Sequence, residues 1–167
     1  MVTRRVLVQG LSLSLLGLAS RHSNAASETP FLRVSGEIGA GEGPGERVFD
    51  AVSFAALPQT HIRTATPWHQ DAVDFSGVSA KNLFTAVERR GANAQLIALN
   101  DYMVEASIDE VVAADGLFAT HQNGVAMPIS DKGPIFLLFP FDDRPELRHQ
   151  AYYSRAVWQL SEVVVTT

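Results

Sequence analysis

The sequence predicts a single mixed α+β domain, in which a mixed sheet is accompanied by a few short helices, behind an amino-terminal leader. The chain has 167 residues, which is enough for one domain at roughly 100–200 residues per domain. Hydrophobic residues make up 46% of it and charged residues 19%, as is typical of a globular chain with a packed core. Segments with the two-residue period of strands alternate with segments of helical period.

In the first half of the predicted domain, residues 31–35 alternate apolar and polar side chains as a half-buried strand does. The Gly-rich stretch 36–45 that follows is predicted to be a flexible loop, because it lacks the Gly-Lys-Ser/Thr ending of a phosphate-binding loop. Residues 52–57 predict a helical turn. Residues 60–66 alternate as a second strand, and Pro67 ends it because proline cannot donate to a sheet ladder.

The clearest predicted helix follows a short strand at 72–75. Ser79 is a natural N-cap, and apolar residues repeat at i, i+3, i+4 and i+7 from Ala80, which places them on one helical face. The two arginines at 89–90 would lie in the last turn, where the helix dipole favours cations. Gly91 would then take the left-handed closing conformation.

The second half of the chain predicts mainly strands, with one short helix among them. The strongest turn signal is Asn123-Gly124, a pair that tolerates the positive φ angles of a tight hairpin. The predicted elements are strands at 95–99 and 102–106, a helix from 107 or 108 to 114, the hairpin of 117–122 with 125–129, and strands at 135–139 and 157–165.

Residues 1–25 have the layout of a secretory signal peptide. Arg4-Arg5 supply positive charge, and residues 6–19 form an apolar run of 14 positions, shorter than the roughly 20 residues that a membrane-spanning helix needs. The arginine pair also resembles a twin-arginine signal. A buried helix is the weaker alternative, because the run lacks an amphipathic period and no acidic residue precedes Glu28. We expect cleavage near Ala25, a periplasmic or secreted protein, and no permanent membrane span.

The charge of the remaining chain, 26–167, disfavours anionic partners. Three of the 13 Lys and Arg residues lie in the leader, which leaves ten against 18 Asp and Glu, a net charge of −8. This field repels phosphate backbones and anionic lipid surfaces, so we expect no nucleic acid as a partner. A small molecule or an exported protein is expected instead.

Cysteine is absent, which excludes a disulfide framework, a thiolate metal site and a Cys nucleophile. No zinc-type histidine spacing and no Gly-x-Ser-x-Gly nucleophile elbow occurs. We therefore expect no metal and no catalytic residues. The histidines that could join Asp71 in a metal site are interpreted as solvated or singly hydrogen-bonded; they are His61, His69, His121 and His149.

Aromatic residues either line a cleft or belong to the core, and core residues are the more common case. The residues in question are Trp68, Tyr102, Tyr152, Tyr153 and Trp158.

Five segments, spread over Phe31 to Val165, occur in the order seen in the molybdopterin-binding domain of sulfite-oxidase-type oxidoreductases. The chain resembles most closely the small exported bacterial proteins that carry a reduced version of that domain. The resemblance implies the mixed α/β sulfite-oxidase fold and, in active members, a molybdenum–pterin cofactor whose metal is bound by one Cys thiolate. The segments are Thr66-Pro67-Trp68, Phe75-Ser76-Gly77-Val78, Ala98-Leu99-Asn100-Asp101-Tyr102, Asp131-Lys132-Gly133-Pro134 and Ser154-Arg155-Ala156-Val157-Trp158-Gln159-Leu160.

The same resemblance implies that most cofactor anchors are lost. Ala65 or Thr66 stands near the place of the metal-binding Cys, and neither supplies a soft thiolate. The family's His-Gly-x-Pro-x-Arg segment is matched by residues 131–136, with Asp in place of His and Phe in place of Arg, so that only Lys132 could partly replace the cation. The family's Arg-x-Val-Lys is matched by residues 155–158, which keep Arg155 and have Trp in place of Lys. Asp101 and Arg155 match positions that contact the cofactor in active members.

Three functions follow as hypotheses. The leading one is a noncatalytic exported module that uses the old cofactor cleft to bind a small ligand or a partner protein, without molybdopterin. Its candidate contacts are Arg63, Trp68, Asp101, Lys132 and Arg155. The second is a working molybdopterin oxidoreductase in which an oxygen ligand or solvent replaces the Cys. The third is a cofactor-free partner of a signalling or redox complex, recognised through its surface.

Overall fold

The structure, a computed structural model, describes residues 30–167. The predicted signal peptide, residues 1–25, lies outside the described residues. Among the residues that are described, no helix has both the length and the apolar character needed to cross a membrane.

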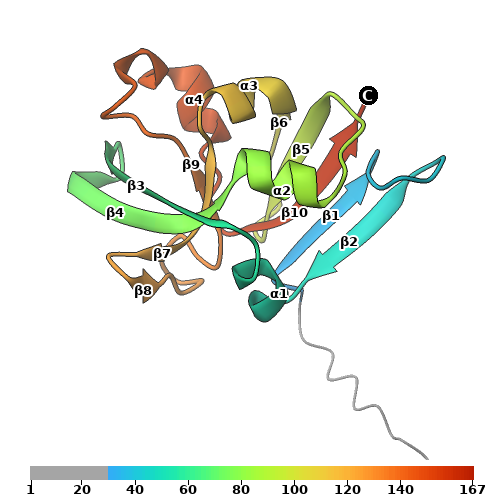
Figure 1. Cartoon of the computed structure of the whole chain (residues 1–167). Coiled ribbons are helices and arrows are strands. Elements are labelled where there is room, and N and C mark those ends of the chain that lie inside the picture. Colours follow the sequence, from blue (N-terminus) through green and yellow to red (C-terminus); the bar gives the residue numbers. More distant parts are fainter. Residues whose placement is uncertain (1–29) are drawn as a thin grey trace, which may run out of the picture.

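Two five-stranded sheets form the framework (Figure 1). The first has the strand order β2-β1-β10-β5-β6, and the second has β3-β4-β7-β8 with β9 paired to β7. The paired strands are antiparallel except for β1 and β10, within the described part of the chain. The strands are β1 (Leu32–Gly36), β2 (Gly45–Phe49), β3 (Gln59–Thr66), β4 (His69–Ser79), β5 (Asn93–Ala98), β6 (Met103–Ser107), β7 (Leu117–Gln122), β8 (Val125–Ala126), β9 (Phe136–Leu138) and β10 (Leu160–Thr166).

Short helices connect and cover these sheets, and Figure 1 shows α3 and α4 near one another beside β6 and β9. The α+β class predicted from the sequence, with a mixed sheet and few short helices, is confirmed. The helices are α1 (Ala51–Ala55), α2 (Ala80–Ala86), α3 (Ile108–Ala113), α4 (Gln150–Arg155) and the 3₁₀ turn η1 (Pro145–Leu147).

Several local predictions are confirmed in detail. The Ser79 side chain accepts a hydrogen bond from the Asn82 backbone N–H and caps α2. Asn123 and Gly124 both have positive φ, at 50° and 77°, and join β7 to β8.

The end of α2 differs from the prediction. The helix stops at Ala86, and Glu88, with φ of 52°, takes the left-handed conformation expected of Gly91. Gly91 instead allows a close approach to the last strand, because a Cβ atom there would lie 2.3 Å from the Thr166 carbonyl oxygen. Strand β2 and helix α4 were not predicted, and β4 runs past Gly77 to Ser79.

The core has a large cluster and a small one. The large cluster is shared by both sheets and includes Phe49, Phe54, Phe118 and Phe139. The small cluster lies on β4, β7 and β9 and contains Phe75, Leu117, Ala119, Phe136 and Leu138 among its members, with Trp68 packed against it. The candidate site described below lies against this smaller cluster, through Trp68 and Ala156.

Candidate functional site

Four loop segments meet at one place between the sheets. They are the β3–β4 turn, the β5–β6 turn, the loop 131–134, and the connection from α4 to β10. Backbone hydrogen bonds join three of them at Gln159: its carbonyl oxygen accepts from Leu99 N at 2.9 Å, and its N–H donates to the Lys132 carbonyl oxygen at 2.9 Å. Four of the five segments that carry the family resemblance therefore converge at this place.

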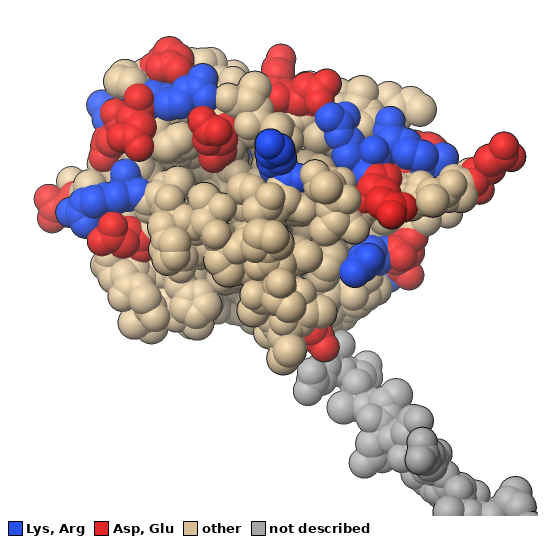
Figure 2. All heavy atoms as spheres, viewed as in Figure 1, with Lys and Arg blue, Asp and Glu red and all other residues tan. Residues whose placement is uncertain are grey.

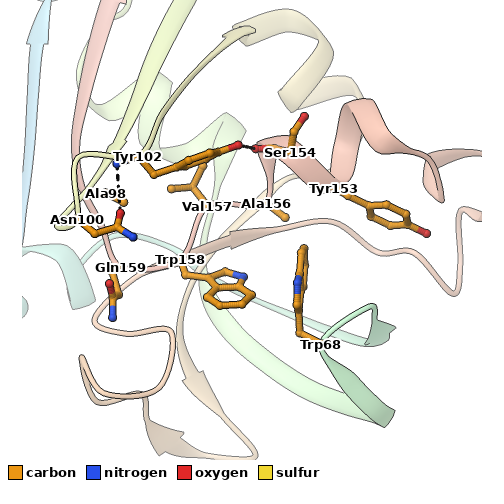
Figure 3. A pocket seen from close by; sticks show the side chains of 10 residues that line it. All are labelled: Trp68, Ala98, Asn100, Tyr102, Tyr153, Ser154, Ala156, Val157, Trp158 and Gln159. Carbon is orange, nitrogen blue, oxygen red and sulfur yellow. Dashed lines mark hydrogen bonds between the residues drawn. The ribbon is translucent and has the colours of Figure 1, made fainter.

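The convergence encloses a cleft of about 220 Å³ (Figure 3). Its walls are mainly aromatic and aliphatic side chains, and none of the side chains that line it is charged. The lining residues are Trp68, Ala98, Asn100, Tyr102, Tyr153, Ser154, Ala156, Val157, Trp158 and Gln159.

An edge-to-face pair of indoles forms one wall of the cleft. The ring centroids of Trp68 and Trp158 lie 5.3 Å apart with the planes at 90°. The Trp68 ring also packs edge-to-face on Phe136 of β9 and on Tyr153 of α4, with centroid distances of 5.8 and 6.5 Å. Edge-to-face contacts of this kind are favourable because the positive edge of one ring meets the negative face of the other. The ring of Trp68 is thus held by Phe136 and Tyr153. Trp158 is more open, with 39% of its surface exposed.

Lys132 is the cation nearest to this wall. Its amine lies 5.4 Å from the centroid of the Trp158 ring and donates a hydrogen bond to Asp131 at 2.8 Å. The Lys132 side chain is only 15% exposed. The hydrogen bond and the positive charge of Lys132 lower the pKa of Asp131 below its ordinary value. The structure therefore places Lys132 beside the cleft, with its charge already paired.

Arg155 and Arg63 point to other partners. The Arg155 guanidinium forms an ion pair with Glu110 at 2.8 Å and lies over the Tyr152 ring, although its neighbours along the chain line the cleft. Arg63 is exposed on β3 and pairs with Asp74 across the β3–β4 hairpin at 2.8 Å. The predicted set thus brings Trp68 and Lys132 together at Trp158, and not the two arginines.

Asp101 lies at the tip of the β5–β6 turn. It has a left-handed backbone, with φ of 64°, and is exposed. The adjacent residues Asn100 and Tyr102 line the cleft, whereas Asp101 itself does not. Its observed role is in the turn, where its N–H donates to the Ala98 carbonyl oxygen at 3.1 Å.

Of the aromatic residues named from the sequence, four line the cleft and one does not. Trp68, Trp158, Tyr102 and Tyr153 face the cleft, and Tyr152 packs on Phe139 of the large core cluster.

Two lining carboxamides, Asn100 and Gln159, were missed by sequence reasoning. Both are adjacent to cleft residues within the resembling segments, but only the chain path reveals that they face the same space.

Behind Trp68, His69 is held by its neighbours. Its Nδ1 lies 2.7 Å from the Thr66 hydroxyl, and its ring packs against Phe75. Burial, followed by the nearby positive charge of Lys132, lowers the pKa of His69. The neutral imidazole is therefore favoured.

The polar and charged groups nearest to the cleft are mostly engaged with other groups of the protein. Thr66, near the position at which the resemblance places a metal-binding Cys, is buried, and its hydroxyl accepts from the backbone N–H of Trp68 at 3.2 Å while contacting His69. Lys132 and Arg155, the two cations that the resemblance associates with a cofactor, are paired with acids. Within residues 30–167, no group of three or more His, Cys, Asp or Glu side chains is arranged to bind a metal. Both of these cations are therefore already paired, although the buried His69 Nε2 has no hydrogen-bond partner within the described residues.

Paired charges are also the rule on the surface. On the face that Figure 2 shows, most Lys and Arg side chains lie next to Asp or Glu. Ion pairs of the described residues include Arg89–Asp109, Arg90–Glu37 and Arg33–Glu46.

The sequence matches no protein-family model, and no curated protein matches it. Among solved structures, the chain is similar to the crystal structure of the sulfane dehydrogenase SoxCD from Paracoccus pantotrophus, with a TM-score of 0.61 and 14% sequence identity. The match covers 81% of this chain and 37% of the SoxCD chain, so this chain spans well under half the length of its neighbour. This likeness shows the fold and supports the sulfite-oxidase-like architecture expected from the sequence.

Proposed function

We propose that this protein is an exported, noncatalytic module that binds a small molecule in the aromatic cleft and contains no molybdopterin. The observation that carries the proposal is the pair of tryptophan rings that lines the cleft. Trp158 stands where the resemblance expects a Lys, and its ring centroid lies 5.3 Å from that of Trp68. An apolar cleft with a few oriented polar groups is the usual form of a small-molecule site.

A catalytic role is less well supported. The oxidoreductase alternative needs an oxygen ligand or solvent in place of the Cys, and the buried Thr66 hydroxyl near that place is already engaged by His69 and the backbone N–H of Trp68. The chain has no Cys to take its place. The only ionisable side chains that line the cleft are those of Tyr102 and Tyr153, and the Tyr102 hydroxyl already donates to the Ser154 carbonyl oxygen at 2.8 Å.

The proposal is tested by titrating the purified protein with N-phenyl-1-naphthylamine, an uncharged fluorescent aromatic. Saturable binding at one site per chain is expected. Trp158→Ala should abolish it, whereas Met103→Ala, which removes a comparably exposed apolar side chain outside the cleft lining, should leave it unchanged.

A parallel sample from the exported fraction of a host that makes molybdopterin should contain neither molybdenum nor pterin fluorescence. One molybdenum per chain, or dye binding that Trp158→Ala leaves intact, would overturn the proposed function.

A further inference from the structure

A groove lies apart from the aromatic cleft, beside the start of the described chain. It consists of two hollows of about 140 and 290 Å³, which adjoin because both are lined by Phe31, Ala51 and Pro134. None of the residues that line the groove also lines the cleft. We call these two hollows the α1 groove, because Ala51 and Phe54 of that helix are among their lining residues.

The α1 groove is preformed and largely apolar. Phe31 packs on the buried Phe54 with 5.5 Å between the ring centroids, and its N–H donates to the Phe49 carbonyl oxygen at 3.0 Å. Two large apolar side chains that line the larger hollow are open to solvent: Ile129 is 58% exposed and Leu99 is 42% exposed. An apolar partner that covers these side chains would therefore bind favourably.

Charged side chains are sparse around the α1 groove. In Figure 2, tan residues dominate the lower half of the face, where Figure 1 places α1 and β8. Of the described residues that line the groove, only Asp50 is an acid or a base other than histidine. The Asp50 carboxylate accepts from the Ser53 N–H at 2.7 Å, and hydrogen bonds with Ser53 lower the pKa of Asp50. The groove therefore favours an occupant that is apolar over most of its length and carries no negative charge.

The chain itself supplies such an occupant. Pro30, the first described residue, lines the larger hollow, so residues 1–29 are joined to the chain at the groove itself. Their sequence contains the apolar run 6–19, three arginines and no acidic residue before Glu28. The ten residues 20–29 can span at most roughly 33–36 Å, which is enough for the apolar run to reach the groove.

We propose that, before the leader is cleaved, the α1 groove binds the apolar run 6–19 of the same chain. Charge favours this contact, because the three arginines of the leader face a body with a net charge of −8. Attachment at Pro30 makes the binding intramolecular and gives an effective concentration in about the millimolar range. The folded domain thereby shields the apolar run from water until export, and removal of the leader opens the groove.

The full chain, purified before export, tests the intramolecular contact. Thermolysin cuts beside large apolar residues, so its rate of cleavage within residues 6–19, followed by mass spectrometry, reports whether the run is covered. Ala51→Arg places a long cationic side chain at an exposed position shared by both hollows, and should raise this rate about tenfold. Ala151→Arg, a matched change of an exposed alanine in the first turn of α4, should leave the rate unchanged.

A fluorescein-labelled peptide of residues 1–25 tests the leader itself. Added to the mature protein from the exported fraction, it should bind at one site per chain with a dissociation constant below about 100 μM. With an effective concentration of about 1 mM, this affinity gives roughly a tenfold excess of the bound form in the full chain.

Peptide variants separate apolar contact from charge. A peptide with Leu13→Asp and Leu16→Asp should bind at least about tenfold more weakly, because two buried leucines are lost. A peptide with Arg4→Lys and Arg5→Lys keeps the charge and should bind as the wild type does. The Ala51→Arg protein should bind the wild-type peptide at least about tenfold more weakly.

Equal cleavage of the wild type and Ala51→Arg would overturn the proposal. Peptide binding that survives the two Leu→Asp changes would do so as well. If circular dichroism shows that Ala51→Arg does not fold, Ile129→Asp, at an exposed position of the larger hollow, replaces it with the same expected results. Neither measurement uses dye binding in the aromatic cleft, so failure here and failure of the proposed function are distinguishable.

Discussion

The guanidinium of Arg155 lies 2.8 Å from the carboxylate of Glu110. Arg155 is the last residue of α4, and Glu110 lies in α3. The resemblance assigns this arginine to a cofactor, yet the fold directs it to a neighbouring helix and over the ring of Tyr152. The cleft beside it is lined by side chains that carry no charge. The small-molecule binding that we propose for this cleft therefore relies on its aromatic rings and neutral hydrogen-bonding groups.

Replacing Arg155 by Ala tests that separation. Since the side chain is 20% exposed, pairs with Glu110 and has its guanidinium over the Tyr152 ring, the variant should lose about 1 kcal/mol of stability. Dye binding in the cleft should be unchanged. Urea unfolding and dye titration measure the two effects, and a large loss of affinity in a folded variant would place Arg155 in the binding site.

The two tryptophans should differ in their effect on stability. Trp68 packs on Phe136, Trp158 and Tyr153, so Trp68→Ala should cost about 2 kcal/mol or more. Trp158 is more exposed, and Trp158→Ala should cost about 1 kcal/mol. Urea unfolding followed by circular dichroism gives both values. The reverse order would mean that Trp158, and not Trp68, supports the cleft.

Stability should fall as the pH drops below about 6.5, the ordinary pKa of histidine. Burial lowers the pKa of His69 in the folded protein, so the unfolded chain binds a proton on this residue first. The contribution of His69 is therefore full above pH 6.5 and is lost progressively between that value and its lower folded pKa.

The variant His69→Asn isolates this effect. Its urea midpoint should be lower than that of the wild type at pH 7.5, because the contacts with Thr66 and Phe75 are lost. Between pH 7.5 and 5.5, the urea midpoint of the variant should fall by less than that of the wild type. Equal declines would show that other groups cause the pH dependence.

Export through the twin-arginine route remains a prediction from residues outside the described part of the chain. Replacing Arg4-Arg5 by Lys-Lys should block appearance of the mature protein in the exported fraction, as measured by immunoblot. Unchanged export would point to the general secretory route.

Local chemistry made much of the fold predictable from the sequence. The Ser79 cap and the Asn123-Gly124 turn depend on neighbouring residues alone, and both are found as predicted. Strand β2 was missed because it is defined by pairing with β1, which a local pattern does not reveal. Glu88 was missed because left-handed backbone usually favours Gly.

The candidate site was harder to predict, for a related reason. Trp68 and Lys132 were named from the sequence and lie at the cleft, but Arg155 is drawn away by Glu110, a partner that no motif indicates. Asn100 and Gln159 face one space only because β5 and β10 are neighbours in the first sheet.

Native mass spectrometry of the protein purified from the exported fraction tests the absence of molybdopterin and the use of the cleft most directly. We predict one uncharged organic molecule per chain, without a molybdenum isotope pattern, and its loss from Trp158→Ala purified in the same way. A bound mass with the isotope pattern of molybdenum, or a small-molecule adduct that persists in Trp158→Ala, would contradict this prediction.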